Sequence, residues 1–235
     1  MICYIILLLS TIFAINFDFS HSNDITVQIN GQLIEQPFLG GLDQPKVQWI
    51  DWDHDGDSDL FVMDSDGNIR YFQNDTDIST DLGLESIDYK FTLVSTKFQN
   101  ISSGGWFYFG HFNNDSLIDL VIQDYNQLNY AHYFENNNGS FISIGLIPLY
   151  GTSLFIESDP VMTPTFADID LDGDLDFFTG NIIGTVSFYE NLGYIDGIPQ
   201  FEYVSNMWQE ISIIGPSIRH GASAINFIDL DGDND

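Results

Sequence analysis

A ten-residue pattern of alternating aspartates recurs along the chain and constrains its fold more than any other feature. The pattern reads DWDHDGDSDL at residues 51–60 and DIDLDGDLDF at residues 168–177. An eroded copy, HFNNDSLIDL, lies at residues 111–120, and a further copy begins as DLDGDND at residues 229–235. A second motif, an aromatic pair followed by any residue and Asn, comes after each of the first three copies, at Tyr71, Tyr133 and Phe188. Two motifs that keep one register indicate an internal repeat.

Each repeat reads as a series of short β-strands. In the first repeat, apolar runs at 47–50 and 60–63 flank the acidic loop, and alternating segments follow at 69–72 and 89–94. The tetrapeptide at residues 64–67, Asp-Ser-Asp-Gly, predicts a tight turn. The third repeat keeps this order, with strands predicted at 176–178, 185–189 and 201–204.

The copies of the acidic loop begin at residues 51, 111, 168 and 229, so one repeat has roughly 60 residues. Four short strands in a repeat of that length are typical of a propeller blade. We therefore predict an all-β chain that forms a partial β-propeller of four-stranded blades, with about three repeats and the start of a fourth. The predicted repeats lie near residues 45–103, 104–159, 160–219 and 220–235, after a lead-in strand in residues 23–44.

The acidic loops carry the donors of a site for a hard cation. Side chains at loop positions 1, 3 and 5 fall on one side of a tight turn, a residue with positive φ at position 6 turns the chain, and position 9 closes the cage. Oxygen donors without His or Cys favour Ca²⁺ over Zn²⁺ or copper, and this many carboxylates favour it over Mg²⁺. The predicted ligands are Asp51, Asp53, Asp55, Asp57 and Asp59; Asn113, Asp115 and Asp119; Asp168, Asp170, Asp172, Asp174 and Asp176; and Asp229, Asp231, Asp233 and Asp235.

The loops are not equal in this respect. We assign Asp57 and Asp174 a role through their backbone carbonyls, which leaves four side-chain carboxylates in the first and third loops. The second loop offers only two carboxylates, because His111, Asn113 and Ser116 replace the residues of the other copies. Metal occupancy of the second loop therefore stays open.

Two further features of the loops bear on their structure. An EF-hand needs a Glu at position 12 and flanking helices, whereas position 12 is Val62, Ile122 or Thr179 and the flanks read as strands. The residues at position 2 predict apolar plugs beneath the turn: Trp52, Phe112, Ile169 and Leu230.

The motif Phe/Trp-x-Asp-x-Asp-x-Asp-Gly-Asp-x-Asp-Leu, followed by Tyr-Phe-x-Asn, resembles the FG-GAP or VCBS repeat. The resemblance covers roughly residues 45–235. It implies a β-propeller with Ca²⁺ in the strand-to-strand loops, used in adhesion or carbohydrate recognition. Propellers of this type close with more blades, so we expect the chain to be part of a longer protein. We also expect the inward side chains of the third repeat, such as Phe178, Val186 and Phe188, to lack part of their cover.

The start of the chain predicts export. The apolar run at residues 3–15 is too short to span a bilayer and fits the core of a signal peptide cleaved after Ser22, with a membrane anchor as the alternative. The only cysteine, Cys3, lies in this run, so the mature chain has no disulfide. We expect a secreted or cell-surface protein.

Composition excludes two classes of partner. The formal net charge is −30, with 5 Lys and Arg against 35 Asp and Glu, which argues against binding to nucleic acid or to an anionic membrane surface. The sequence has no nucleophile elbow, phosphate loop or His-Glu-x-x-His motif, so we do not expect an enzyme. We expect Ca²⁺ and an extracellular protein or glycan ligand as partners. The alternative is a carbohydrate-handling protein, either a lectin or the non-catalytic blades of a lyase or hydrolase.

Overall fold

The computed structural model describes residues 27–34, 41–76, 90–213 and 223–228. In these residues the regular structure is β-strand, apart from two short 3₁₀ turns at Phe98–Asn100 and Trp208–Glu210. The predicted all-β class is confirmed. The chain divides into two compact units, residues 1–41 and 42–235, and the predicted signal peptide at 1–22 lies outside the described residues.

The first unit contains one described hairpin, formed by β1 (Val27–Ile29) and β2 (Gln32–Ile34). The sequence predicts one lead-in strand in this region, and the chain instead forms two. The reason is the Asn30-Gly31 pair, whose φ values of 54° and 82° suit the tight turn of a two-residue hairpin.

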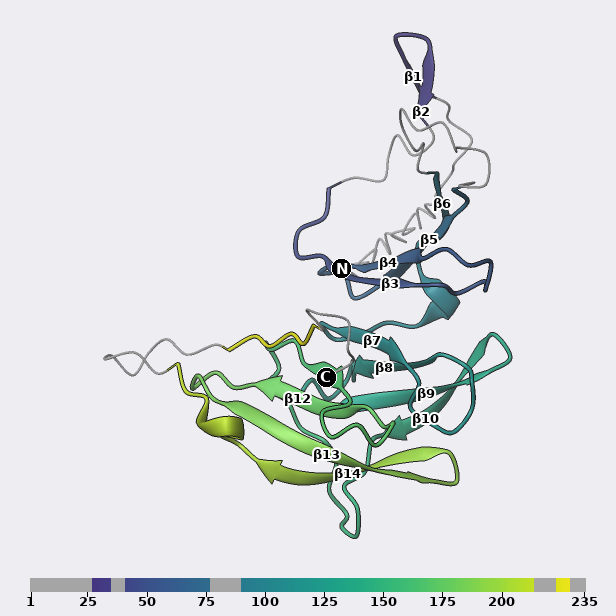
Figure 1. Cartoon of the computed structure of the whole chain (residues 1–235). Coiled ribbons are helices and arrows are strands. Elements are labelled where there is room, and N and C mark those ends of the chain that lie inside the picture. Colours follow the sequence, from purple (N-terminus) through teal and green to yellow (C-terminus); the bar gives the residue numbers. More distant parts are fainter. Residues whose placement is uncertain (1–26, 35–40, 77–89, 214–222, 229–235) are drawn as a thin grey trace, which may run out of the picture. The chain divides into compact units, whose positions relative to one another are not determined.

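The second unit contains three four-stranded antiparallel sheets, each made of strands that are consecutive in the chain (Figure 1). The first sheet has β3 (Lys46–Ile50), β4 (Asp59–Met63), β5 (Ile69–Asn74) and β6 (Phe91–Ser95). The second has β7 (Phe107–Gly110), β8 (Asp119–Gln123), β9 (Ala131–Asn137) and β10 (Ser140–Leu146). The third has β11 (Thr165–Ala167), β12 (Asp176–Gly180), β13 (Val186–Ile195) and β14 (Ile198–Ser205).

These strands lie where the apolar runs predict them, and each acidic loop joins the first two strands of its sheet. The main difference is β13, which continues to Ile195 instead of ending near residue 189. The pairing of β13 with β14 shifts register between Asn191 and Tyr194, around Gly193 with its φ of 90°. Because of this bulge, β13 continues past Asn191, the last residue of the aromatic motif, as far as the turn before β14.

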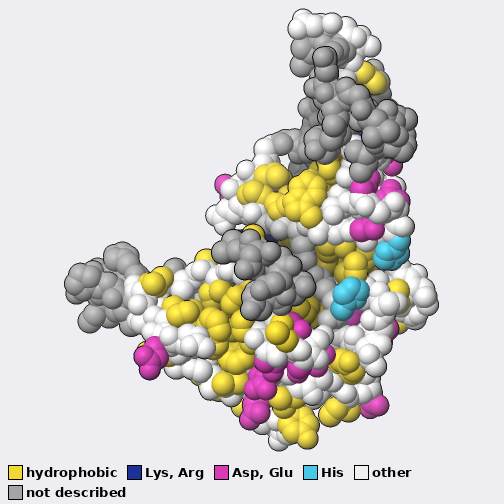
Figure 2. All heavy atoms as spheres, in the orientation of Figure 1, with side chains coloured by type: hydrophobic (Ala, Val, Ile, Leu, Met, Phe, Trp, Pro, Cys, Tyr) yellow, Lys and Arg dark blue, Asp and Glu magenta, His cyan; other side chains and the backbone are white. Residues whose placement is uncertain are grey.

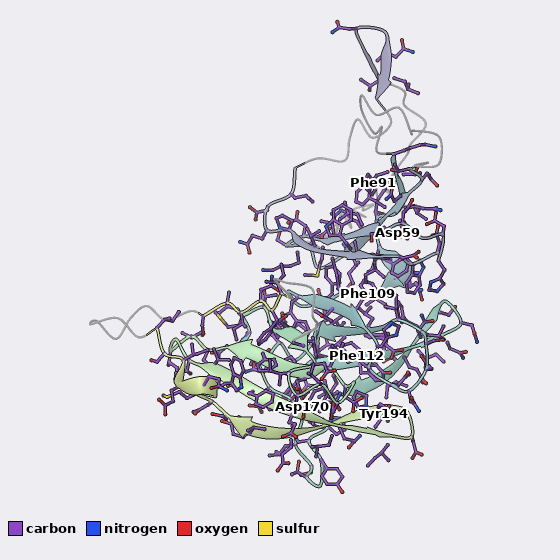
Figure 3. The ribbon with its side chains drawn as sticks, viewed as in Figure 1. Asp59, Phe91, Phe109, Phe112, Asp170 and Tyr194 are labelled. Atoms are coloured by element: carbon purple, nitrogen blue, oxygen red, sulfur yellow. The ribbon has the colours of Figure 1, made fainter. Side chains whose placement is uncertain are left out.

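Aromatic side chains fill the space between successive sheets. One buried cluster joins Phe61 and Tyr71 of the first sheet to Phe107 and Phe109 of the second. A second cluster joins Tyr133 of the second sheet to side chains of the third, among them Phe166, Phe177 and Tyr189. Figure 3 labels Phe109 and Phe112, one in each of these two layers. Each sheet therefore buries one face against the next, which is how repeated sheets form a continuous core.

A carboxamide fixes the first strands of the first two sheets beside each other. Gln48 on β3 donates from Nε2 to the carbonyl oxygen of Phe109 at 2.7 Å and accepts the Phe109 N–H at 2.8 Å through Oε1. Both polar ends of one side chain are thus satisfied by one backbone residue of β7. This pair of hydrogen bonds holds β3 of the first sheet in line with β7 of the second.

The open side of the third sheet is covered, contrary to expectation. Phe178, Val186 and Phe188 are 0%, 1% and 9% exposed. The segment 223–228 packs on them through Phe227, whose ring lies 4.6 Å from that of Phe178, and Trp208 of the 3₁₀ turn lies 5.0 Å from it. The prediction of missing cover was wrong for these three side chains because both segments reach over the sheet.

Among the described residues, no helix is long and apolar enough to cross a membrane.

Candidate metal sites

Two of the acidic loops each bring three carboxylates together. Asp51, Asp53 and Asp55 place one oxygen each within 4.8 Å of the others, and so do the corresponding residues of the third loop, Asp168, Asp170 and Asp172. These are loop positions 1, 3 and 5, as predicted. The clusters lie in the β3–β4 and β11–β12 connections, at the same place in the first and third sheets.

The backbone path explains why these side chains converge. Gly56 and Gly173 at position 6 have φ values of 100° and 97°, as predicted, and position 4 is also left-handed, at 61° in His54 and 64° in Leu171. The position-4 conformation was not foreseen, because neither His nor Leu signals it. The turn directs backbone N–H groups inward: Gly56 donates to Asp51 at 3.2 Å and Gly173 donates to Asp168 at 3.0 Å.

Two oxygens of the first loop show an unmet demand for positive charge. Oδ1 of Asp51 and Oδ1 of Asp57 are buried and have no hydrogen-bond partner within the described part of the chain. Burial and the neighbouring carboxylates Asp59 and Asp55 raise the pKa of Asp53. Burial and the nearby carboxylates also raise the pKa of Asp57. Buried anionic oxygens without donors are costly, and a bound cation removes that cost. The donor set is oxygen only, which suits a hard divalent cation.

Asp57 was assigned a role through its backbone carbonyl. The buried, unpartnered Oδ1 makes its carboxylate a further candidate donor in the first loop. In the third loop the pKa of Asp174, its counterpart, is likewise raised by burial and by the charges of Asp172, Asp168 and Asp170.

The position-9 aspartates have a structural role that the sequence did not reveal. Asp59, Asp119 and Asp176 are the first residues of β4, β8 and β12 and are almost fully buried. Each accepts a backbone N–H from position 2 of its own loop and another from the Asn of the aromatic motif. The latter bonds, from Asn74, Asn136 and Asn191, measure 2.8, 2.8 and 2.7 Å.

The same asparagines complete the attachment from the other side. Their Nδ2 groups donate to the carbonyl oxygens at loop position 8: Asn74 to Ser58 at 3.1 Å, Asn136 to Ile118 at 2.9 Å, and Asn191 to Leu175 at 3.2 Å. This paired contact, which we call the Asp–Asn clamp, ties each acidic loop to the third strand of its sheet. It explains why the two motifs keep one register.

The clamp differs in detail between repeats. Tyr71 and Tyr133 also donate their hydroxyls to Asp59 and Asp119, at 3.2 and 2.9 Å. Phe188 stands at that position in the third repeat and has no hydroxyl. There, burial raises the pKa of Asp176 to about 6, although the N–H groups of Asn191 and Ile169 oppose the shift. Asp176 thus accepts one hydrogen bond fewer than Asp59 and Asp119 do.

The second loop follows a different path and satisfies itself. His111 at position 1 contacts the Leu117 carbonyl oxygen through Nδ1 at 2.9 Å, so Nδ1 carries the hydrogen. Leu117 stands at position 7, which the first and third loops fill with Asp57 and Asp174. Neither Asn114 at position 4 nor Ser116 at position 6 has a positive φ. Of its predicted ligands, Asn113 donates to the Tyr133 hydroxyl at 3.3 Å and Asp119 belongs to the clamp, which leaves Asp115 as the only carboxylate of the turn.

The position-2 plugs are confirmed in two loops. Trp52 packs 5.2 Å from Phe98 and 5.5 Å from Phe141, and Phe112 is 1% exposed with Phe166 at 4.9 Å. Ile169 is 41% exposed, so the prediction is wrong there. The first two plugs are covered by the sheet that follows, and the described residues contain no such sheet after the third. Leu230 and the ligands Asp229, Asp231, Asp233 and Asp235 lie outside the described residues.

Acidic side chains gather in separate patches on the face shown in Figure 2, where Lys and Arg are scarce. This distribution matches the high negative charge of the chain and leaves few internal cations to balance the loops.

Comparison with known families supports the repeat. Residues 111–179 match the model of the FG-GAP-like repeat, a segment that runs from the second acidic loop through the third. The predicted resemblance is thus confirmed, and this segment includes the loop that departs most from the pattern. No curated protein and no solved structure matches the chain at a significant level.

Proposed function

We propose that this chain, which carries an FG-GAP-like repeat at residues 111–179, is a calcium-binding module of propeller blades that acts in adhesion or ligand binding outside the cell. The observation that carries the proposal is the pair of three-carboxylate clusters in equivalent loops, together with the buried, unpartnered oxygens of Asp51 and Asp57. Ca²⁺ accepts six to eight oxygen ligands in flexible geometry, which suits a loop with this many carboxylates.

The propeller and the location are part of the same proposal. Three four-stranded sheets, each packed face to face on the next, are compatible with successive blades of an open propeller. Secretion is supported by the apolar run at residues 3–15 and by the family match. We propose binding instead of catalysis, because three carboxylates in each of the two loops cluster with one another, as the ligands of a cation would.

In the calcium-loaded protein, the loop carboxylates would hold the ion and the clamps would fix each loop to its sheet. The ion would supply the positive charge that cancels repulsion among Asp51, Asp53 and Asp55, and equally among Asp168, Asp170 and Asp172. The chain's own residues then keep the connections between the first two strands rigid, so that the sheet edges present a fixed surface to a partner.

A calcium titration with single substitutions tests the proposal. The unmodified chain should bind two Ca²⁺ ions, and Asp55→Ala and Asp172→Ala should each remove one of them. Asp115→Ala is the matched control, because it removes an aspartate at the same position of the second loop and should change little. Isothermal titration calorimetry counts the sites. Equal losses from all three substitutions, or no binding by the unmodified chain, would contradict the proposal.

Carbohydrate recognition is the second candidate function. It requires a concave site whose polar groups match hydroxyls, and one cavity beside the third sheet has that composition.

A further inference from the structure

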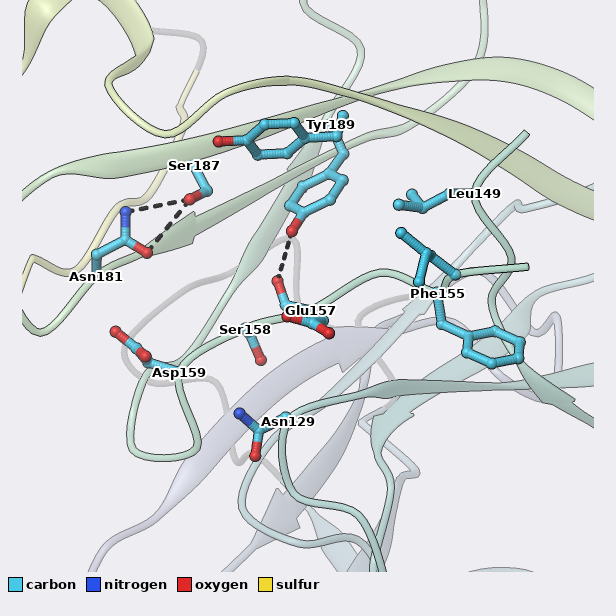
Figure 4. A pocket seen from close by; sticks show the side chains of 11 residues that line it. Asn129, Leu149, Phe155, Glu157, Ser158, Asp159, Asn181, Ser187 and Tyr189 are labelled. Atoms are coloured by element: carbon cyan, nitrogen blue, oxygen red, sulfur yellow. Dashed lines mark hydrogen bonds between the residues drawn. The ribbon is translucent and has the colours of Figure 1, made fainter. Parts of the chain in front are cut away.

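A cavity of about 430 Å³ lies between the β10–β11 connection and the third sheet (Figure 4). This volume falls in the range of small-molecule sites, roughly 300–1,000 Å³. None of the described residues that line it belongs to an acidic loop, so the metal sites do not account for it.

Ser158 is the strongest sign that the cavity has a ligand. The residue is only 6% exposed, and its Oγ has no hydrogen-bond partner among the described residues. Its backbone is held in place, since Ser158 N–H donates to the Asn129 carbonyl oxygen at 2.8 Å. A buried hydroxyl without a partner is costly, and native proteins rarely keep one without a reason. A ligand atom that both accepts and donates a hydrogen bond would satisfy it.

The other walls are already ordered. Tyr189 donates its hydroxyl to the Glu157 carbonyl oxygen at 3.1 Å, and the Asn181 carboxamide exchanges two hydrogen bonds with Ser187 Oγ, at 3.1 and 3.2 Å. Asp159 accepts the Ile182 N–H through Oδ2 at 2.6 Å. These bonds fix the walls before any ligand enters, which lowers the entropic cost of binding.

The charge of the lining selects among ligand classes. Glu157 and Asp159 line the cavity, and no Lys, Arg or His appears among the described residues around it, so an anion is disfavoured. An amine would supply donors alone, whereas the buried Ser158 hydroxyl also brings an O–H donor that needs an acceptor. Hydroxyl groups supply both.

Flat apolar surface completes the match. Phe155 and Tyr203 line the cavity and are 37% and 47% exposed, so neither aromatic residue is fully covered by the protein. The Tyr203 ring is held edge to face against Tyr189, with ring centroids 5.2 Å apart. Exposed aromatic faces next to polar groups suit a ligand with one apolar face and a rim of hydroxyls.

We propose that this cavity binds a neutral pyranose unit of a glycan. The inference rests on the proposed role in ligand binding and names the ligand class of that role. The carboxylates would accept hydrogen bonds from vicinal hydroxyls, Ser158 would exchange one with a further hydroxyl, and an aromatic face would pack against the C–H face of the ring.

Saturation-transfer NMR on the calcium-loaded full chain tests the proposal with a panel of neutral methyl pyranosides, with glucosamine and glucuronate as charged arms. At least one neutral pyranoside should give ring-proton signals, and neither charged sugar should bind better. Ser158→Ala and Tyr203→Ala should each weaken the binding about tenfold, which corresponds to the loss of one good contact.

Tyr125→Ala is the matched control, because Tyr125 is 63% exposed and lies outside the cavity lining. Ser158→Ala should leave the melting temperature unchanged, since the hydroxyl has no partner to lose, and this separates binding from folding. Silence of all neutral sugars, preference for a charged sugar, or unchanged binding by both variants would overturn the inference. A calcium titration of the same sample shows separately whether the proposed metal sites stand.

Discussion

At the scale of single residues, we propose that position 1 of the acidic loop decides whether a loop needs a metal ion. Asp51 and Asp168 accept the N–H of the position-6 glycine and add a charge that the loop does not neutralise. His111 instead donates to the carbonyl oxygen of Leu117 at position 7. The His111 imidazole thus occupies the position-7 carbonyl oxygen, whereas the carboxylates at position 1 of the other loops have no hydrogen to donate to it.

Restoring the residue pattern should therefore restore a site. The double variant His111→Asp, Ser116→Gly should bind one more Ca²⁺ ion than the unmodified chain, because it returns the position-1 carboxylate and allows a positive φ at position 6. Calorimetric titration measures the stoichiometry. His111→Asn with Ser116→Gly is the control, since it removes the imidazole without adding charge. An unchanged stoichiometry in the Asp variant would show that position 1 is not decisive.

At the scale of elements, turns hold neighbouring repeats in register. Gly67 ends the β4–β5 turn with a φ of 72°, and its N–H donates to the Asp64 carbonyl oxygen at 2.9 Å. Its Cα faces the backbone carbonyl of Ser103, which lies just before the second sheet, and Ser103 N–H donates to the Gly67 carbonyl oxygen at 2.9 Å. The turn of one sheet is thus bonded to the entry of the next.

This contact leaves no space for a side chain. Gly67→Ala should destabilise the protein more than Gly139→Ala, as measured by chemical denaturation. Both glycines have positive φ, 72° and 89°, so both substitutions carry a left-handed cost of about 1–2 kcal/mol. Only at Gly67 would the new Cβ meet backbone, since nothing lies within 4 Å of the Cβ position at Gly139. If both substitutions lowered the free energy of unfolding equally, the contact between Gly67 and Ser103 would not constrain the two sheets.

A second turn gives a pH-dependent contribution. Asp124 accepts N–H groups from Asn126 and Gln127, at 2.9 and 2.7 Å, and contacts His132 Nδ1 at 2.9 Å. Burial alone would raise the pKa of Asp124, but the hydrogen bonds from His132, Gln127 and Asn126 outweigh it and lower the pKa below 3.8. A carboxyl whose pKa is lower in the folded state stabilises the fold above its unfolded pKa, and that stability is lost as the pH falls through the folded value.

Asp124→Asn should accordingly lower the free energy of unfolding at pH 7, and the difference from the unmodified chain should shrink on going from pH 5 towards pH 3. Urea denaturation at each pH measures it. Asp196→Asn, in the exposed β13–β14 turn, is the control and should show little effect at any pH. A loss that is the same at all three pH values would contradict the assigned role of the carboxylate.

The sequence predicted the strands and the two strong acidic clusters because both depend on local order. Alternating apolar residues and a run of Asp before Gly specify their geometry within a few residues. The Asp–Asn clamp escaped prediction because Asp59 and Asn74 meet only after β4 and β5 have paired. The 3₁₀ turns escaped it because Gln99 and Gln209 adopt φ values of 48° and 52° that their residue type does not signal. The cover of Phe178 likewise depends on a segment about 50 residues away.

At the scale of the whole molecule, three sheets share two aromatic layers while the chain carries a net charge of −30. The aromatic layers hold the sheets together, whereas the clustered carboxylates of the acidic loops repel one another in the connections between strands. The described chain holds few ion pairs to offset this, the clearest being Arg70 with Asp66 at 2.8 Å. A net charge of this size opposes the compact state, so bound cations should contribute a large part of the stability.

The magnitude of that contribution follows from mass action. Extracellular calcium modules bind with dissociation constants of about 10⁻⁴–10⁻³ M, and at ten times the dissociation constant one site adds about 1.4 kcal/mol. Two sites would add about 3 kcal/mol, out of a total of roughly 5–15 kcal/mol for a folded domain. For a chain of this size, that gain corresponds to roughly 6–12 °C in melting temperature.

The most direct test of calcium-dependent stability is the melting temperature of the protein in about 10 mM Ca²⁺ and in excess EDTA, with the double variant Asp55→Ala, Asp172→Ala as control. Calcium should raise the melting temperature of the unmodified protein by at least roughly 6–12 °C, the value for sites at the weak end of the affinity range, and should leave that of the variant nearly unchanged. A melting temperature that is the same in calcium and in EDTA would show that the acidic loops do not need a metal ion.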